Sequence, residues 1–203
     1  MIWSANKPSK WDRNTAIILA HGAGAGMNTP FMMFFHDQLA SRGFATVKFD
    51  FEYMEQKRHV PDPQPKLRAR YQQVIEEVNA ELKPKRIIIG GKSMGGRVAS
   101  YIAGDIDVVA GLVFLGYPLH APGKTEQLRD EHLYTLDRPM LFISGTRDTL
   151  ARRDLLEGVV DRIGARATML WIEGGDHSLK TGRKSDSSLP TAVDTITAWI
   201  QSL

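Results

Sequence analysis

The chain has 203 residues, of which 42% are apolar and 24% are charged, and its formal net charge is +3. This balance is typical of a globular protein and excludes a chain that is disordered throughout, while the length favours a single domain over residues 1–203. Because the chain has no cysteine, a disulfide framework, a thiolate metal site and a cysteine nucleophile are excluded, and we expect neither a metal nor a cofactor.

The mild excess of basic residues does not indicate a nucleic-acid partner. The densest basic cluster, around Lys57-Arg58-His59, is interrupted by prolines and is typical of a solvated loop. The N-terminal segment lacks a basic stretch followed by an apolar run, and no stretch reaches the roughly 18 apolar residues of a membrane span. We therefore expect a soluble, cytoplasmic protein, and the sequence does not indicate its oligomeric state.

Six apolar runs predict the strands of one sheet. Most of them are continuously apolar, which is typical of parallel strands that are covered on both faces. In chain order they are Ala16–Ala20, Phe44–Phe49, Arg86–Gly90, Val108–Leu115, Pro139–Ser144 and Ala167–Ile172.

Helical patterns fill the gaps between these runs. They are expected from Thr29 to Ser41, from Leu67 to Leu82, from Met94 to Ile102, over residues 152–163, and from near Pro190 onward. Strands alternating with helices predict a doubly wound, mostly parallel α/β sheet of about six strands with helices on both faces and little or no lid. The longest connection, Tyr117–Asp137, is expected to hold a short helix that borders the site.

A glycine-rich loop, His21–Gly26, follows the first run. In hydrolases such a loop supplies an oxyanion donor, for which we favour the backbone N–H of Ala23 and then that of Gly24. A dinucleotide-binding loop is the alternative, but Met27 stands where its last glycine should be. His21 is expected to pack its ring and to bond the loop backbone.

Gly91-Lys92-Ser93-Met94-Gly95 follows the third run and precedes a helical pattern, which is the context that a G-x-S-x-G nucleophile turn requires. The turn predicts Ser93 as the nucleophile, with the Met94 N–H at a helix N-terminus as an oxyanion donor. A glycine-rich turn with an incidental serine is the alternative. A phosphate-binding P-loop is disfavoured because Arg86 occupies the position of its first glycine.

Chain order selects the base and the acid, which follow the serine in the order acid and then histidine in this kind of site. His177 comes directly after the last strand, where a loop can reach back over Ser93. Asp148 follows the fifth strand after a turn and is expected to hold the His177 ring.

The other acidic and histidine candidates are given other roles. We expect His132 to be exposed on a polar helical segment and His120 to line the pocket. Asp176 is adjacent to His177 and is expected to brace its loop, while Asp50 precedes Ser93 and is expected to buttress loops.

Six segments resemble the KANL3/Tex30-type α/β-hydrolase-like family over nearly the whole chain, with dienelactone-hydrolase-like proteins as wider relatives that use cysteine in place of Ser93. The segments are His21–Gly24, Phe49–Phe51, Gly90–Arg97, Gly116–His120, Gly145–Asp148 and Gly175–Ser178. The resemblance implies the fold and the triad positions more firmly than an activity, because some animal members of the family act as complex subunits.

Together these features predict a serine hydrolase that cleaves a small-molecule carboxylic ester or thioester, with small acyl groups favoured and amide hydrolysis left open. The expected substrate-binding residues are Met27, Lys92, Tyr117, Leu119 and His120, with Met94 as a further apolar candidate. The apolar residues among them could equally belong to the core. An acidic or phosphorylated acyl group is favoured by the basic side chains near the strand ends, which are Lys92, Arg97, His120 and Arg147. Arg97 could instead hold loop carbonyls. The alternative is a non-catalytic protein-interaction module on the same fold.

Overall fold

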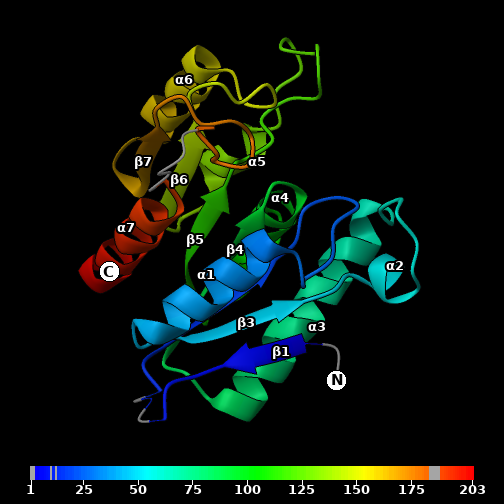
Figure 1. Ribbon diagram of the computed structural model, residues 1–203, viewed down its shortest axis with the longest axis vertical. Coiled ribbons are helices and arrows are strands. Elements are labelled where there is room, and N and C mark those ends of the chain that lie inside the picture. Colours follow the sequence, from blue (N-terminus) through cyan, green and yellow to red (C-terminus); the bar gives the residue numbers. More distant parts are fainter. Residues whose placement is uncertain (1–2, 10, 12, 183–187) are drawn as a thin grey trace.

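The computed structural model describes residues 3–9, 11, 13–182 and 188–203, and the remaining residues lie outside the described part. Its centre is a seven-stranded sheet in the order β1-β3-β2-β4-β5-β6-β7, with helices on both faces (Figure 1). Only the pairing of β1 with β3 is antiparallel. The strands are β1 Trp3–Asn6, β2 Thr15–Ala20, β3 Ala45–Phe49, β4 Arg86–Lys92, β5 Val109–Leu115, β6 Met140–Gly145 and β7 Ala167–Ile172.

The predicted doubly wound α/β architecture is confirmed, and the observed elements lie within a few residues of the expected ones. The α-helices are α1 Pro30–Ser41, α2 Glu52–Glu55, α3 Gln64–Leu82, α4 Met94–Ser100, α5 Glu131–Thr135, α6 Arg153–Ile163 and α7 Ser188–Ser202. Two short 3-10 turns, η1 Ala103–Asp105 and η2 Gly164–Arg166, precede β5 and β7. In the described part of the chain, no helix combines the length and the apolar character that a bilayer crossing requires.

Alternation along the buried strands divides the core into two layers. In β2, Ile17 and Leu19 pack with α1 and α7, whereas Ile18 and Ala20 face the layer that contains α3, α4 and α6. Successive side chains of a strand point to opposite faces, so a strand covered on both faces is apolar throughout. This is the physical reason for the continuous apolar runs.

The strand β1 is one more than the expected six. It is four residues long, and only Trp3 is buried in it. The strand forms the antiparallel edge of the sheet, with Trp3 opposite Phe49 and Asn6 opposite Thr46. A short edge strand with one buried residue has no apolar run, so the pattern that identifies the other strands does not detect it.

The order of the strands places a crevice between the ends of β2 and β4. After β2 the chain crosses to β3 on one side, and after β4 it crosses to β5 on the other. The connections that leave β2 and β4 therefore diverge, which leaves an opening at the carboxyl edge of the sheet. The glycine-rich loop and the nucleophile turn both lie at this opening.

Gly90 lies in β4 directly beside Val113 of β5, and we expect Gly90→Ala to lower the free energy of unfolding by more than about 2 kcal/mol. A Cβ built at this position would come within 1.9 Å of the Val113 backbone oxygen. Gly158→Ala is the matched control, because a Cβ there meets no atom within 4 Å and α6 should gain up to about 1 kcal/mol. Urea denaturation measures both, and equal stability of the two variants contradicts the close approach of the strands.

Candidate active site

The turn between β4 and α4 holds Ser93 in an unusual backbone conformation. Its φ is 50° and its ψ is −114°, a combination that non-glycine residues rarely adopt. Ideal Cβ atoms at Gly91 and Gly95 would lie 2.1 Å and 2.4 Å from the backbone oxygen of Ala20, so both positions require glycine. The tight approach of the turn to β2 keeps the half-buried Ser93 side chain above the strand ends.

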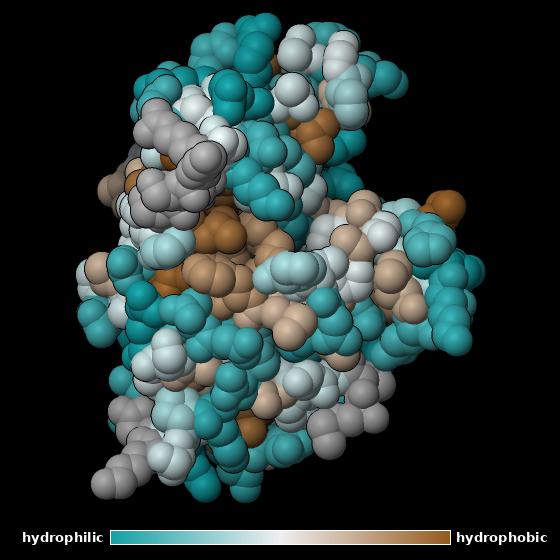
Figure 2. Space-filling view, in the orientation of Figure 1, coloured by the Kyte–Doolittle hydropathy of each residue, from teal (hydrophilic) through white to brown (hydrophobic). Residues whose placement is uncertain are grey.

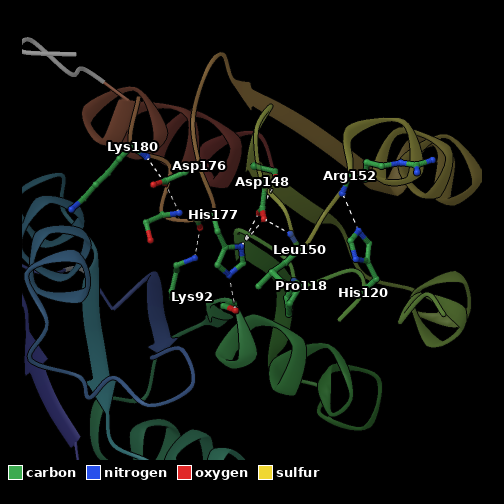
Figure 3. A network of polar contacts seen from close by, with 12 residues as sticks. Lys92, Pro118, His120, Asp148, Leu150, Arg152, Asp176, His177 and Lys180 are labelled. Carbon is green, nitrogen blue, oxygen red and sulfur yellow. Dashed lines mark hydrogen bonds and ion pairs between the residues drawn. The ribbon is translucent and has the colours of Figure 1, made fainter. Parts of the chain in front are cut away.

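Two further side chains form a line with Ser93. The Nε2 atom of His177 lies 2.9 Å from Ser93 Oγ, and its Nδ1 atom lies 2.9 Å and 2.8 Å from the two carboxylate oxygens of Asp148. Figure 3 shows the His177 ring facing the Asp148 carboxylate. Asp148 is only 4% exposed, so its negative charge is held beside the ring and not screened by water.

The acid is itself fixed by its neighbours. Asp148 Oδ1 accepts from the backbone N–H of Leu150 over 2.8 Å, and Asp148 Oδ2 lies 3.5 Å from the Ser144 hydroxyl. These bonds arise because the chain turns tightly after β6. The carboxylate therefore has a single orientation, which presents both oxygens to His177.

The loop that carries His177 is braced by Asp176 and Arg147. Asp176 Oδ1 accepts from the N–H groups of Ser178 and Lys180 over 2.7 Å and 3.0 Å, which is the bracing role expected for this aspartate. Arg147 Nε donates to the Gly174 carbonyl over 2.7 Å. The loop conformation thus depends on side chains that make no contact with Ser93.

Lys92 supports the same loop from below. Its ammonium group donates to the backbone carbonyl of His177, as Figure 3 shows. Burial lowers the pKa of Lys92 to about 8, and the negative charges of Asp148 and Asp176 partly oppose this effect. Lys92 therefore positions the histidine loop and also lines a cavity beside Ser93.

The two N–H groups favoured as oxyanion donors are available. Neither the N–H of Met94 nor that of Ala23 donates to another described residue. The N–H of Gly24, the second candidate in the loop, donates instead to the Tyr53 hydroxyl over 3.2 Å. Of the two loop candidates, only Ala23 therefore keeps an N–H that has no partner among the described residues.

His21 and Asp50 hold the glycine-rich loop in place. His21 is fully buried, with Nδ1 2.7 Å from the Gly22 carbonyl and Nε2 3.2 Å from the Phe51 nitrogen. Burial is the main cause that lowers the pKa of His21, so the ring is neutral and can donate from Nδ1 and accept at Nε2. Asp50 Oδ1 accepts from the Met27 N–H over 2.7 Å. Both residues have the structural roles expected for them.

Two cavities meet at Ser93. The larger, of about 710 Å³, is the α1 cavity, whose wall combines apolar side chains with His177 and Lys92. Figure 2 shows apolar surface gathered at the centre of this face, in the region of α1. The side chains that define the α1 cavity here are Pro30, Phe31, Phe34, Leu189, Lys92 and His177.

The smaller cavity, of about 480 Å³, is the arginine cavity, and it opens on the other side of Ser93. Its wall combines prolines, Met94, His120 and two arginines, and it does not include His177. Ala23, Ser93 and Leu150 border both cavities. Any substrate that reaches Ser93 can therefore extend in two directions.

The expected pocket residues are distributed unevenly. Lys92 lines the α1 cavity, and His120 lines the arginine cavity although only 2% of its surface is exposed. Tyr117 and Leu119 line neither cavity, because both are buried in the hydrophobic core. Met27 is half-buried and also lies outside both linings.

His132 corrects one expectation. It is half-buried and not exposed, because its ring stacks on Tyr101 with the centroids 4.1 Å apart and its Nε2 lies 2.8 Å from Ser100 Oγ. Burial, followed by the positive charges of Arg68 and Arg97, lowers the pKa of His132 to about 4. The short helix α5 thus packs on α4 instead of projecting into water.

A known protein family matches this chain over almost its whole length. The family profile described as an alpha/beta hydrolase domain matches residues 13–202. The chain belongs to the α/β-hydrolase family.

Three solved structures illustrate how the α/β-hydrolase fold is shared at low sequence identity. A dienelactone hydrolase from Anabaena variabilis superposes with a TM-score of 0.79 at 18% identity, covering 98% of this chain and 90% of that one. Est1E from Butyrivibrio proteoclasticus, with ferulic acid bound, gives 0.78 at 14% identity and coverages of 98% and 94%. A serine hydrolase without a lid from Xanthomonas campestris gives 0.76 at 16% identity and coverages of 98% and 88%.

Several residues that line the cavities of this α/β hydrolase cannot be predicted from the sequence. Phe31 and Phe34 lie three positions apart on α1, a spacing that indicates one helix face but not whether that face is core or cavity wall. Leu150 and Arg129 come from loops that have no recognisable pattern. Only the proximity of these loops to Ser93, which depends on the fold, identifies them.

Raising the pH from about 8 to about 10 should stabilise the wild-type protein relative to Lys92→Met. The pKa of Lys92 is about 8 in the folded chain against an ordinary value of 10.5, so between these values the unfolded state binds more protons. The stability that Lys92 contributes therefore rises with pH and is lost as the pH falls through about 8. Urea unfolding of both proteins over this range measures the difference.

The control is Lys180→Met, which removes an exposed lysine from the wall of the same cavity. Subtracting its pH profile separates the effect of burial from the loss of one positive charge. A wild-type advantage that stays flat or decreases between about pH 8 and pH 10 contradicts the buried position of Lys92.

Proposed function

We propose that this chain is a serine hydrolase that cleaves a carboxylic ester or thioester through an acyl-enzyme intermediate. The observation that carries the proposal is the continuous line from Ser93 Oγ through the His177 ring to the Asp148 carboxylate, with separations of 2.9 Å and 2.8 Å. A serine hydroxyl becomes an effective nucleophile when a base within hydrogen-bond distance removes its proton. The geometry of this α/β hydrolase meets that requirement without any movement.

In the first half of the reaction, His177 Nε2 takes the Ser93 proton while Ser93 Oγ forms a bond to the acyl carbon. The carbonyl oxygen becomes an oxyanion, which the N–H groups of Met94 and Ala23 stabilise. The bond between the acyl carbon and the leaving oxygen or sulfur then breaks, and His177 gives its proton to that atom. The products are a free alcohol or thiol and an ester of Ser93.

In the second half, water takes the place of the leaving group. His177 removes a proton from the water, whose oxygen attacks the Ser93 ester and forms a second oxyanion in the same place. The bond to Ser93 Oγ breaks, and His177 returns the proton to Ser93. Asp148 stays ionised throughout and stabilises the positively charged ring that forms in each half.

The openness of the site supports a small-molecule substrate. Ser93 is half-buried at the junction of two cavities of about 710 Å³ and 480 Å³. Cavities of this size suit compact organic ligands. An ester is also the substrate class suggested by two fold neighbours, a dienelactone hydrolase and an esterase domain from Rhodothermus marinus, both below 25% identity.

Within the α/β hydrolases we place this chain beside the KANL3/Tex30-type proteins. The support is its Gly-Lys-Ser-Met-Gly-Gly-Arg segment at 91–97 and its Gly-Tyr-Pro-Leu-His segment at 116–120. Both segments border the arginine cavity through Met94, Arg97, Pro118 and His120. The resemblance therefore falls on residues around the proposed site.

A fluorophosphonate probe should label the wild-type protein and should not label Ser93→Ala or His177→Ala. The probe forms a stable bond only with a serine whose proton is removed by a base. Hydrolysis of 4-nitrophenyl esters by either variant should be slower by about 10⁴-fold or more in kcat. Gel fluorescence and absorbance measure the two effects.

Ser41→Ala is the control, because Ser41 is an exposed residue at the end of α1. It should be labelled as strongly as the wild type. Labelling that is equal in all four proteins, or absent from all of them, contradicts the proposed mechanism and favours a non-catalytic interaction module.

A further inference from the structure

Two arginines line the arginine cavity beside the nucleophile. Arg97 lies on α4, one turn after Ser93, and lines the cavity. Its backbone N–H donates to the Ser93 carbonyl over 3.1 Å. Arg129 reaches the same cavity from the connection between β5 and α5. One turn of helix rises ~5.4 Å, so the Arg97 backbone is fixed close to the reacting hydroxyl.

Neither arginine has a carboxylate partner among the residues that the structure describes. Among the described residues, no ion pair involves Arg97 or Arg129. The guanidinium of Arg129 makes one long hydrogen bond of 3.4 Å, to the Pro118 carbonyl. The Nε atom of Arg97 is buried and has no hydrogen-bond partner in the described part of the chain. A cationic group that lacks an acceptor is costly to bury, so the guanidinium of Arg97 favours an anionic partner.

The carboxylate already in the cavity does not fill this role. Asp62 lines the same wall, but its oxygens lie 2.8 Å from Arg58 and 3.6 Å from Lys66, and these two cations balance its charge. Burial lowers the pKa of Arg129, and the positive charge of Arg97 adds to this effect. The cavity therefore keeps an excess of positive charge.

The remaining wall suits a rigid, specific pocket. Four prolines line it, namely Pro61, Pro63, Pro118 and Pro122. Proline has no backbone N–H and a fixed φ, so these residues offer few competing donors and little freedom to collapse. The two arginines are the principal donors to an anion that enters the cavity, and their planar groups match a carboxylate.

The proposed reaction determines which half of the substrate occupies which cavity. The leaving atom must lie within reach of His177, which lines the α1 cavity and does not line the arginine cavity. The acyl chain must then extend from the tetrahedral carbon away from His177. The α1 cavity thus receives the leaving group, and the arginine cavity receives the acyl group.

On this basis we propose that the substrate is an ester or thioester of an acyl group that carries a second carboxylate, which Arg97 and Arg129 bind. The inference rests on the proposed hydrolase function and adds the substrate class. The second carboxylate takes no part in the bond changes, and its role is to anchor the acyl chain. Apolar leaving groups are favoured by Phe31 and Phe34 in the α1 cavity.

The test compares two esters with equal numbers of acyl carbons, mono-4-nitrophenyl adipate and 4-nitrophenyl hexanoate, with Ser93→Ala as the blank. The wild-type kcat/KM should be at least about tenfold higher for the adipate ester, the effect expected of a charge-assisted hydrogen bond. The ratio of the two values should decrease about tenfold or more in Arg97→Gln and in Arg129→Gln, and Arg97→Lys should restore part of it.

Arg153→Gln is the control, because this arginine is exposed on α6, pairs with Glu157 and lines neither cavity. It should keep the wild-type ratio. Fluorophosphonate labelling of each arginine variant reports whether its nucleophile is intact, so that misfolding is not mistaken for lost recognition. A wild-type ratio of one or less, or a ratio that the Arg97 and Arg129 variants leave unchanged, overturns the inference while Ser93-dependent hydrolysis still supports the proposed function.

A binding measurement separates the two proposals when no ester is cleaved. Calorimetry with Ser93→Ala protein and monomethyl adipate should detect binding that weakens about tenfold or more when Arg97→Gln is added. Such binding without Ser93-dependent hydrolysis supports the anion site and overturns the hydrolase proposal. Absence of binding, or binding that does not depend on Arg97, overturns the anion site.

Discussion

The backbone of Ser93 is held at φ 50° and ψ −114°, which costs an L-residue ~1–3 kcal/mol. Two hydrogen bonds of 3.1 Å stabilise it, one from the Ser93 N–H to the Leu115 carbonyl and one from the Arg97 N–H to the Ser93 carbonyl. The close approach of α4 to Ala20 leaves no room for side chains on the flanking glycines. The direction of the hydroxyl, the position of the Met94 N–H and the place of Arg97 in its cavity all depend on this one turn.

The rest of the site is assembled around that turn by the ends of four parallel strands of the sheet. β2 leads into the glycine-rich loop, β4 into Ser93, β6 into Asp148 and β7 into His177. Because the parallel strands all end at the same edge, residues that are 84 positions apart come within a hydrogen bond. The same convergence separates two cavities, one apolar with the histidine in its wall and one lined by arginine and proline.

Sequence patterns predict those features that local physics determines. Continuous apolar runs identify six strands, and the context of Gly91–Gly95 identifies the turn, because both depend on nearby residues alone. The edge strand at Trp3–Asn6 lacks such a run, and Tyr117 resembles a wall residue until its burial is known. The arginine cavity is least predictable from sequence, because Arg129 comes from an irregular connection whose path is set by tertiary packing.

The most direct test of the proposed chemistry is to trap the enzyme during turnover. Wild-type protein mixed with excess 4-nitrophenyl ester, quenched in acid and digested, should yield a peptide containing Ser93 whose mass is increased by that of the acyl group less one hydrogen. The Asp148→Asn protein should accumulate this species far more slowly, because its histidine is not held with Nε2 free to accept a proton. Hydrolysis that proceeds with the Ser93 peptide unmodified, or with the acyl group on another residue, contradicts the account.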